Sequence, residues 1–177
     1  MSTEDVKLAI DGDTQAFSRL IKDCEATLYR VAKGILKSDH ECADAIQEAI
    51  LKAFKRINTL KHPQFFKTWL VRILINECYY IVKQNKKIFS IENINEIAYE
   101  KVDSFDVIEI DKAIKQLISE QQVIIILFYY EEFSIKEIME MLNLREGTVK
   151  SRLHRARLHL AKLLRFHFSE EEGEMYE

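Results

Sequence analysis

One stretch of the chain decides the fold, Ser134–Arg157, which reads SIKEIMEMLNLREGTVKSRLHRAR. Ser134, with Glu137 three residues later, is typical of a helix that begins with a capping box. Asn143 tolerates the left-handed backbone conformation, so the chain can turn there. The residues that follow predict a second helix, because its apolar positions recur in steps of four and three along one face. These positions are Val149, Leu153, Ala156, Leu160 and Leu163.

The other faces of this second helix are basic and polar. They carry Lys150, Ser151, Arg152, His154, Arg155 and Arg157. A helix, a short turn and a basic helix form the helix-turn-helix pattern, whose second helix enters the major groove of DNA. Arginine and lysine can donate to guanine edges or to phosphates, and serine can contact either. The pattern therefore favours DNA binding, with an amphipathic helix in an ordinary bundle as the alternative.

The rest of the chain also predicts helices. Its 177 residues include 4 glycines and 1 proline, too few turn-forming residues for a β-sandwich or barrel. Helical spacing of apolar residues runs through 17–36, 38–60, 65–87 and from 107 onward. The apolar run 123–130 could be a buried strand by itself, but Ser119 with Gln122 resembles a capping box and favours a helix. The predicted fold class is all-α.

Charge is distributed unevenly along the chain, whose net charge is −3. Residues 61–90 and 134–165 are both strongly basic, and the acidic stretch 91–111 separates them. The last nine residues, 169–177, are acidic, and we expect them to be disordered. Two basic blocks indicate two surfaces that meet a polyanion, although solvated helix faces would look the same.

Other features exclude several classes of protein. No apolar run approaches the roughly 20 residues that span a bilayer, so we expect a cytoplasmic protein without membrane insertion. The consecutive residues Asp39–Cys42 are metal-ligand types, but on a helix they fan out and cannot converge on one ion. His154 and His159 lie five residues apart and lack the i, i+4 spacing of a zinc helix. We therefore expect no metal, no cofactor and no enzymatic activity, and bound metal in the purified protein would contradict this.

Four motifs together resemble one protein family. They are GDTQAF (12–17), DHECADAIQE (39–48), FKTWLVRILIN (66–76) and GTVKSRLHRAR (147–157). In this order and spacing they are similar to the extracytoplasmic-function (ECF) group of bacterial RNA polymerase sigma factors, over about residues 9–164. The resemblance implies two small helical domains. Its expected division is sigma region 2 at 1–88, an acidic linker at 89–107, the region 4 helix-turn-helix at 108–168 and an acidic tail at 169–177.

The resemblance also implies partners and roles. Such proteins bind core RNA polymerase, recognise two promoter elements, help to open the duplex and are commonly inhibited by an anti-sigma factor. The residues expected to bind polymerase are Asp44, Gln47 and Glu48. Those expected at the proximal promoter element and in melting are Trp69, Arg72, Asn76, Tyr80, Lys83, Lys86 and Lys87. Those expected at the distal element are Arg145, Thr148, Lys150, Ser151, Arg152, His154, Arg155 and Arg157, with Arg152 and Arg157 on phosphates.

The sequence departs from the family pattern at a few of these positions. Tyr80 and Lys83 stand where the family often has an aspartate and an arginine, and Met139 and Asn143 replace a usual alanine and glycine. A stand-alone helix-turn-helix regulator, which would bind an operator as a dimer, is the alternative function. No segment of the chain looks like a dedicated dimerisation helix.

Overall fold

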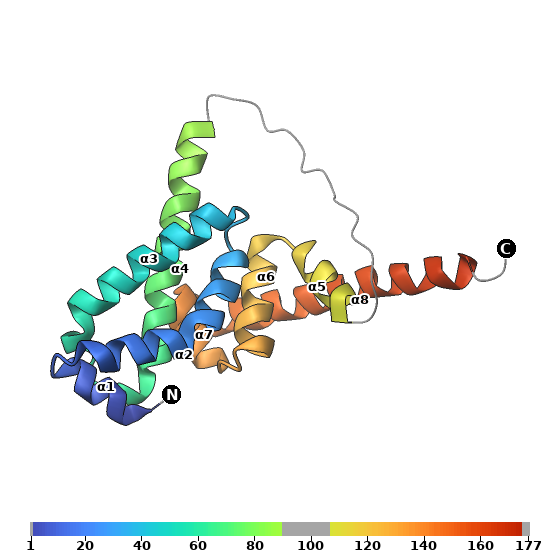
Figure 1. Cartoon of the computed structure of the whole chain (residues 1–177). Helices are drawn as coiled ribbons and strands as arrows, with labels where there is room; N and C mark the ends of the chain where they lie inside the picture. Colours follow the sequence, from blue (N-terminus) through green and yellow to red (C-terminus); the bar gives the residue numbers. More distant parts are fainter. Residues whose placement is uncertain (1, 90–106, 175–177) are drawn as a thin grey trace.

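The computed structural model describes the backbone of residues 2–89 and 107–174, and the side chains of residues 2–85 and 110–164. Every regular element in these ranges is helical, which confirms the predicted all-α class (Figure 1). The elements before the undescribed segment 90–106 are α1 (Thr3–Ile10), α2 (Thr14–Lys33), α3 (Asp39–Arg56), η1 (Ile57–Thr59), η2 (Pro63–Phe65) and α4 (Phe66–Phe89). Those after it are α5 (Val107–Lys115), α6 (Ser119–Ile125), η3 (Ile126–Tyr130), α7 (Ile135–Leu142) and α8 (Glu146–Glu174).

Several helix ends lie where local sequence signals predicted them. Ser38 caps α3 by accepting a hydrogen bond from the Glu41 backbone N–H. The capping box of α7 is complete, with Ser134 and Glu137 each bonding to the other's backbone. Asn143 ends α7 in the left-handed conformation, at φ 51° and ψ 49°. The helix-turn-helix geometry therefore rests on the residues that predicted it.

Other ends differ from the expectation. The cap of α6 is Ile118 and Ser119 is its first residue, so the predicted cap at Ser119 is wrong. The apolar run 123–130 is helical as expected, but its second half forms a π-helical turn, η3. α8 continues to Glu174, so the expectation of disorder is wrong for 169–174. The rest of the tail, 175–177, and most of the expected linker lie outside the described residues.

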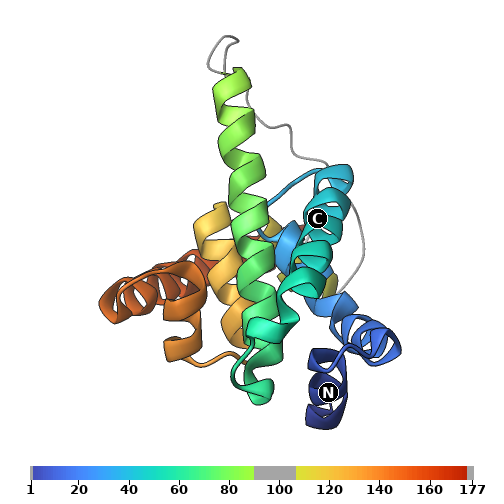
Figure 2. The same cartoon turned by 90° about the vertical axis from the view of Figure 1, so that its left-hand side faces the viewer.

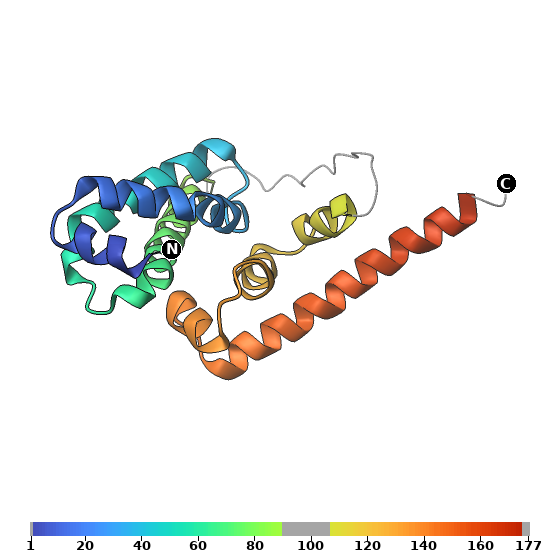
Figure 3. The same ribbon diagram turned by 60° about the horizontal axis from the view of Figure 1, so that its bottom comes forward.

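α4 lies at the centre of the molecule. Figure 2 shows it upright, with α1–α3 on one side and α7 and α8 on the other. Buried apolar side chains from both sides form one continuous core, which runs from Val6 in α1 to Ala156 in α8. The C-terminal half of α8 extends away from the other helices (Figure 3). Within 2–89 and 107–174, none of the helices is both long and apolar enough to cross a membrane.

Small side chains let α3 approach α4 closely. Ala45, Ala49 and Ala53 recur every four residues on the buried face of α3, and none of them is exposed by more than 1%. Phe66, Leu70 and Leu74 are among the fully buried apolar residues of the first turns of α4. Since residues four apart share one face of a helix, the alanines form a shallow stripe that a neighbouring helix can fill. This packing fixes the N-terminal four-helix unit.

Candidate functional site

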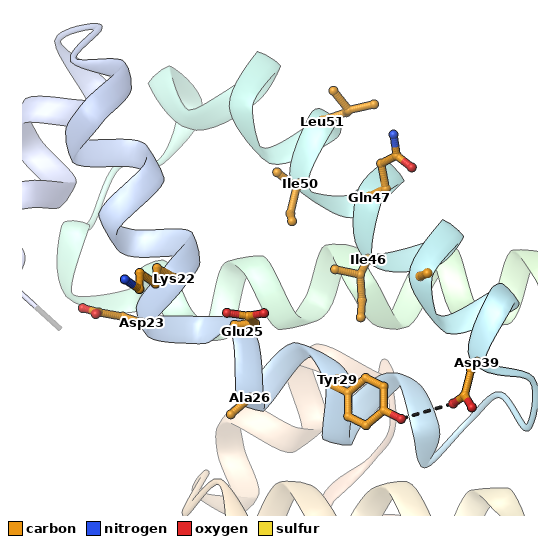
Figure 4. Close-up of a pocket in the computed structure, with 11 residues that line it drawn as sticks. Lys22, Asp23, Glu25, Ala26, Tyr29, Asp39, Ile46, Gln47, Ile50 and Leu51 are labelled. Carbon is orange, nitrogen blue, oxygen red and sulfur yellow. Dashed lines mark hydrogen bonds between the residues drawn. The ribbon is translucent and has the colours of Figure 1, made fainter.

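The outer face of α3 borders a groove of about 800 Å³ between α2 and α3 (Figure 4). The groove is mainly apolar, with Tyr29 from α2 and Ile46, Ile50 and Leu51 from α3 among its lining residues. Gln47, predicted to bind polymerase, also lines it, and Asp44 and Glu48 are exposed on the same helix. The α3 surface therefore combines an apolar groove with an acidic border.

Hydrogen bonds and one ion pair hold the groove border in place. Asp39, at the start of α3, accepts hydrogen bonds from the Tyr29 hydroxyl at 3.1 Å and from the Lys33 ammonium at 2.9 Å. These hydrogen bonds, that of Lys33 first, hold the pKa of Asp39 below its usual value. His40 Nδ1 lies 2.9 Å from Asp44. Asp39 and His40 are thus engaged with neighbouring side chains of the groove border.

One exposed face of α4 carries most of the residues predicted at the proximal promoter element. Trp69, Arg72, Asn76, Tyr80 and Lys83 recur in steps of three and four, so they share one side of the helix. Trp69 is half-buried against the core, whereas the other four are exposed, Tyr80 by 59%. The face combines aromatic rings with cations. The backbone of α4 continues through 86–87, but the side chains of Lys86 and Lys87 lie outside the described ones.

The start of α8 carries a second basic face. Arg145, just before α8, is exposed, and Thr148 in its first turn is half-buried. Lys150, Ser151, His154 and Arg155 are all exposed, and their spacing places them on neighbouring turns. Lys150 forms an i, i+4 ion pair with Glu146, and hydrogen bonding to this lysine lowers the pKa of Glu146. None of these six positions carries a phenylalanine, tyrosine or tryptophan, in contrast to the α4 face.

Two arginines of α8 that were predicted to contact phosphates make other contacts here. Arg152 forms an ion pair with Glu120 of α6 at 2.9 Å, and its side chain is 21% exposed. The guanidinium of Arg157 lies over the rings of Phe128 and Tyr129, 5.9 and 5.5 Å from their centroids. Both arginines of α8 therefore have partners in α6 or η3.

Glu131, at the end of η3, joins the C-terminal helices to α2 and α4. Its side chain is 1% exposed, and its carboxylate accepts hydrogen bonds from Thr27 Oγ1 at 2.6 Å and Arg30 Nε at 2.8 Å. The Lys67 ammonium lies 2.9 Å from the same carboxylate and 5.1 Å from the centroid of the Phe133 ring. Burial raises the pKa of Glu131, but the hydrogen bonds from Thr27, Lys67 and Arg30 outweigh it, so the pKa lies below its usual value.

Two further contacts lie at the same junction. Thr68 of α4 donates a hydrogen bond to Glu137 Oε1 of α7 at 2.9 Å, while Glu137 Oε2 accepts from the Ser134 hydroxyl and backbone N–H. Gly34, after α2, lies so close to Ile126 that a Cβ on Gly34 would be 2.7 Å from Ile126 Cδ1. The junction therefore combines carboxylate contacts with an apolar approach.

Sequence reasoning missed the groove and the junction. Ile46 and Ile50 are half-buried, and they pack against the core while they also line the groove; the width of the apolar surface of α3, which includes Leu51, was the available signal. The partners of Glu131 on α2 lie 101 and 104 residues away in the sequence. No local pattern connects positions so far apart.

Comparisons with known proteins place the chain in a family. The family model described as Sigma-70 region 2 matches residues 20–88, and that described as Sigma-70, region 4 matches residues 108–160. The RNA polymerase sigma factor SigV of Bacillus subtilis is 30% identical over 154 residues, covering 86% of this chain and 90% of SigV. The ECF RNA polymerase sigma factor SigM of Mycobacterium tuberculosis H37Rv is 29% identical, covering 88% of this chain and 80% of SigM.

Solved structures are similar as well. The sigma factor RpoE in complex with the anti-sigma factor NepR from Bartonella quintana is 25% identical, has a TM-score of 0.72, and the match covers 86% of this chain and 98% of RpoE. CnrH, in complex with the cytosolic domain of CnrY, is 19% identical, with a TM-score of 0.64 and coverage of 92% and 96%, so it shares the fold. The chain therefore belongs to the ECF RNA polymerase sigma factors, which direct promoter-specific transcription.

Proposed function

We propose that three surfaces of this sigma factor divide the work of initiation. The α3 face with the adjoining groove binds core RNA polymerase, the α4 face binds the proximal promoter element as it melts, and the α8 face binds the distal element. Residues 1–88 then act as region 2, residues 108–168 as region 4, residues 89–107 as their linker and residues 169–177 as a tail.

The observation that carries the proposal is the groove between α2 and α3. It places exposed apolar groups, among them Leu51, beside the exposed polar side chains of Asp44, Gln47 and Glu48. An apolar centre with a polar border is the composition of a protein-binding surface. A stand-alone regulator would use such a surface to bind a second copy of itself, so binding to core polymerase is the measurement that separates the two functions.

The two basic faces differ in a way that fits two promoter elements. Melted bases need aromatic side chains on which to stack and cations that follow the backbone, and the α4 face offers Trp69 and Tyr80 among Arg72 and Lys83. Duplex DNA is read by donors that reach into the major groove, such as Lys150 and the other exposed side chains of α8. We expect Arg152 and Arg157 to reach phosphates after leaving their present partners.

We further propose a regulatory partner and a cellular compartment for this chain. RpoE was solved with the anti-sigma factor NepR, and this supports an anti-sigma protein as a partner of this chain. We infer that the chain acts in the cytoplasm, where its polymerase and promoter partners are, and that it works by binding alone, without catalysis, metal or cofactor.

Binding to core RNA polymerase tests the proposal. We expect the labelled protein to bind core polymerase one to one in fluorescence anisotropy without DNA, and D44A/Q47A to weaken binding at least tenfold. The matched control is Gln116→Ala with Glu140→Ala, which removes one amide and one carboxylate from exposed positions of α5–α7. A folded protein that does not bind core polymerase would contradict the proposal and favour the stand-alone regulator.

A further inference from the structure

A buried carboxylate connects the two regions of this sigma factor. Glu131 belongs to region 4, yet its hydrogen-bonding and ionic partners Thr27, Arg30 and Lys67 all belong to region 2. The backbone N–H of Glu131 donates to the Ile126 carbonyl, five residues back, which is the spacing of a π-helical turn. This turn ends η3 at Glu131, whose side chain reaches both α2 and α4.

The contact is strong but lies near solvent. A carboxylate bonded to a guanidinium and an ammonium makes charge-assisted hydrogen bonds, which are shorter and stronger than neutral ones. Arg30 and Lys67 keep 43% and 35% of their side chains exposed. Water and competing anions can therefore reach both cations when Glu131 withdraws, so the contact can open without leaving two buried charges unpaired.

Two acidic groups of region 4 occupy cations, one in region 2 and one in the DNA-binding helix. Lys67 lies in the first turn of α4, two residues before Trp69, and is held between Glu131 and the Phe133 ring. Arg152 of the DNA-binding helix is held by Glu120 of α6. Of these two cations, Arg152 is one that the proposed function assigns to a DNA phosphate, so its pair with Glu120 must open for that contact.

From these contacts we propose that Glu131 is an interdomain latch. In the free protein it holds region 4 on α2 and α4, and its release precedes productive binding to polymerase and promoter DNA. This proposal rests on the proposed function, because it assumes that α3, α4 and α8 are the binding surfaces. It adds a regulatory role for a residue outside all three surfaces.

The test compares two neighbouring carboxylates. Glu131→Gln removes the buried charge and sets an amide donor against Arg30 and Lys67. Glu132→Gln removes the same charge from the next residue, which is exposed. In the proposed mechanism, only molecules with Glu131 released can bind core polymerase, so the apparent affinity falls with the fraction of molecules in which the Glu131 contact is closed. We therefore expect E131Q to bind core polymerase about three- to tenfold more tightly than the wild type, and E132Q to bind like the wild type.

Small-angle X-ray scattering of the free proteins reports opening directly. We expect a larger radius of gyration for E131Q than for the wild type and for E132Q. A second variant, Thr68→Val, removes the hydrogen bond to Glu137 while keeping the shape of the side chain. It should produce the same two changes to a smaller extent, so the test does not depend on the folding of E131Q alone.

The outcomes separate the two proposals. If all four proteins bind core polymerase equally, the latch is overturned and the proposed function stands. If E131Q and T68V keep the compact radius of gyration of the wild type, Glu131 does not hold the regions together and the latch is again overturned. If folded wild type and E132Q both fail to bind core polymerase, the proposed function fails, and the regulatory role of Glu131 fails with it.

Discussion

Helix α4 is packed on two sides by very different contacts. On one side, α3 meets it through a stripe of buried alanines and through apolar residues such as Leu70. On the other side, region 4 contributes the two carboxylates of Glu131 and Glu137, bonded to cations and hydroxyls of region 2. The first contact excludes water, and the second is bordered by it.

This difference separates a permanent contact from a reversible one. Close packing of apolar side chains loses much of its energy when helices move apart slightly, so α3 and α4 must remain together. A polar contact can exchange its partners for water or phosphate, so breaking it leaves region 2 folded, and the remaining cost of moving region 4 off α4 is the exposure of the apolar side chains that both regions add to the shared core. The remaining side of α4, with Tyr80, is open.

The largest effect should come from the α3 side. Ala49→Leu inserts three carbon atoms into the stripe that α4 covers, and overpacking of this kind should destabilise the protein by about 3 kcal/mol. Thermal unfolding followed by circular dichroism checks it. Ala43→Leu, an exposed alanine on the same helix, is the control and should leave the melting temperature nearly unchanged. Equal effects of the two changes would refute the tight packing of α3 on α4.

A substitution on the open side of α4 should affect promoter opening and leave the stability of the protein unchanged. Tyr80→Ala removes an exposed ring on which an unpaired base can stack, which is worth about 1–3 kcal/mol per base. We expect promoter opening, measured by permanganate footprinting of the holoenzyme, to fall about tenfold or more, with an unchanged melting temperature. Tyr80→Phe keeps the ring and should retain most of the opening. Normal opening by Y80A would remove Tyr80 from the melting surface.

The junction with region 4 should have an intermediate effect on stability. Glu131→Gln replaces a carboxylate that has two cationic partners, and we expect a loss of about 1–2 kcal/mol, because partial exposure of Arg30 and Lys67 reduces the penalty of losing their partner. Urea unfolding measures the loss. Glu132→Gln serves as the control, and an equal loss for both variants would mean that the buried position of Glu131 contributes nothing.

The same comparison has a pH dependence with a defined sign. The pKa of Glu131 is lowered, so its contribution to stability is present above the ordinary pKa of glutamate, about 4.5, and is lost as the pH falls through the lowered value. Burial raises the pKa of the Cys24 thiol to about 11, so this thiol stays neutral in this range. The stability difference between wild type and E131Q should therefore be constant from pH 7.5 to 5.5 and shrink below about pH 4.5. A difference that already shrinks above pH 5.5 would contradict the lowered pKa.

The smallest effect should come from an ion pair at the edge of the α3–α4 contact. Lys52 Nζ lies 2.6 Å from Glu77 Oε2, but the lysine is 36% exposed. Lys52→Met should cost less than about 1 kcal/mol, and the cost should decrease with added salt. Chemical unfolding at low and high salt tests this prediction. Lys55→Met, at an exposed position of the same helix, is the control, and a salt-independent cost at Lys52 would indicate lost packing instead.

The sequence predicted local structure well, because local signals cause it. Ser134 begins α7 and Asn143 ends it, both through interactions within a few residues, so the two predicted ends are confirmed. Ser119 misled the prediction, since Ile118 takes the extended cap conformation and no side chain caps α6. Helical spacing also identified the exposed face of α4, because a period of three to four residues defines a face without any knowledge of its neighbours.

Contacts between the two regions could not be predicted in this way. Periodicity shows that a residue is buried, not which helix buries it, and Glu131 stood among apolar residues with no local partner. The groove depends on how α2 and α3 diverge, which follows from tertiary packing. What remained predictable about the site was its chemistry: an acidic helix, an aromatic and basic helix, and a basic helix. The partner that each one meets inside the molecule came from the structure.

The two oxygens of the Glu137 carboxylate have different partners, and this affects what happens when region 4 separates from α4. One oxygen, Oε2, serves the start of α7 through Ser134, and the other, Oε1, serves Thr68 of α4. Detachment from α4 costs Glu137 its hydrogen bond from Thr68 and leaves both hydrogen bonds from Ser134 intact. The helix-turn-helix therefore keeps the capping box of α7 when it leaves α4. It can move from one binding surface to another as a folded unit, without refolding.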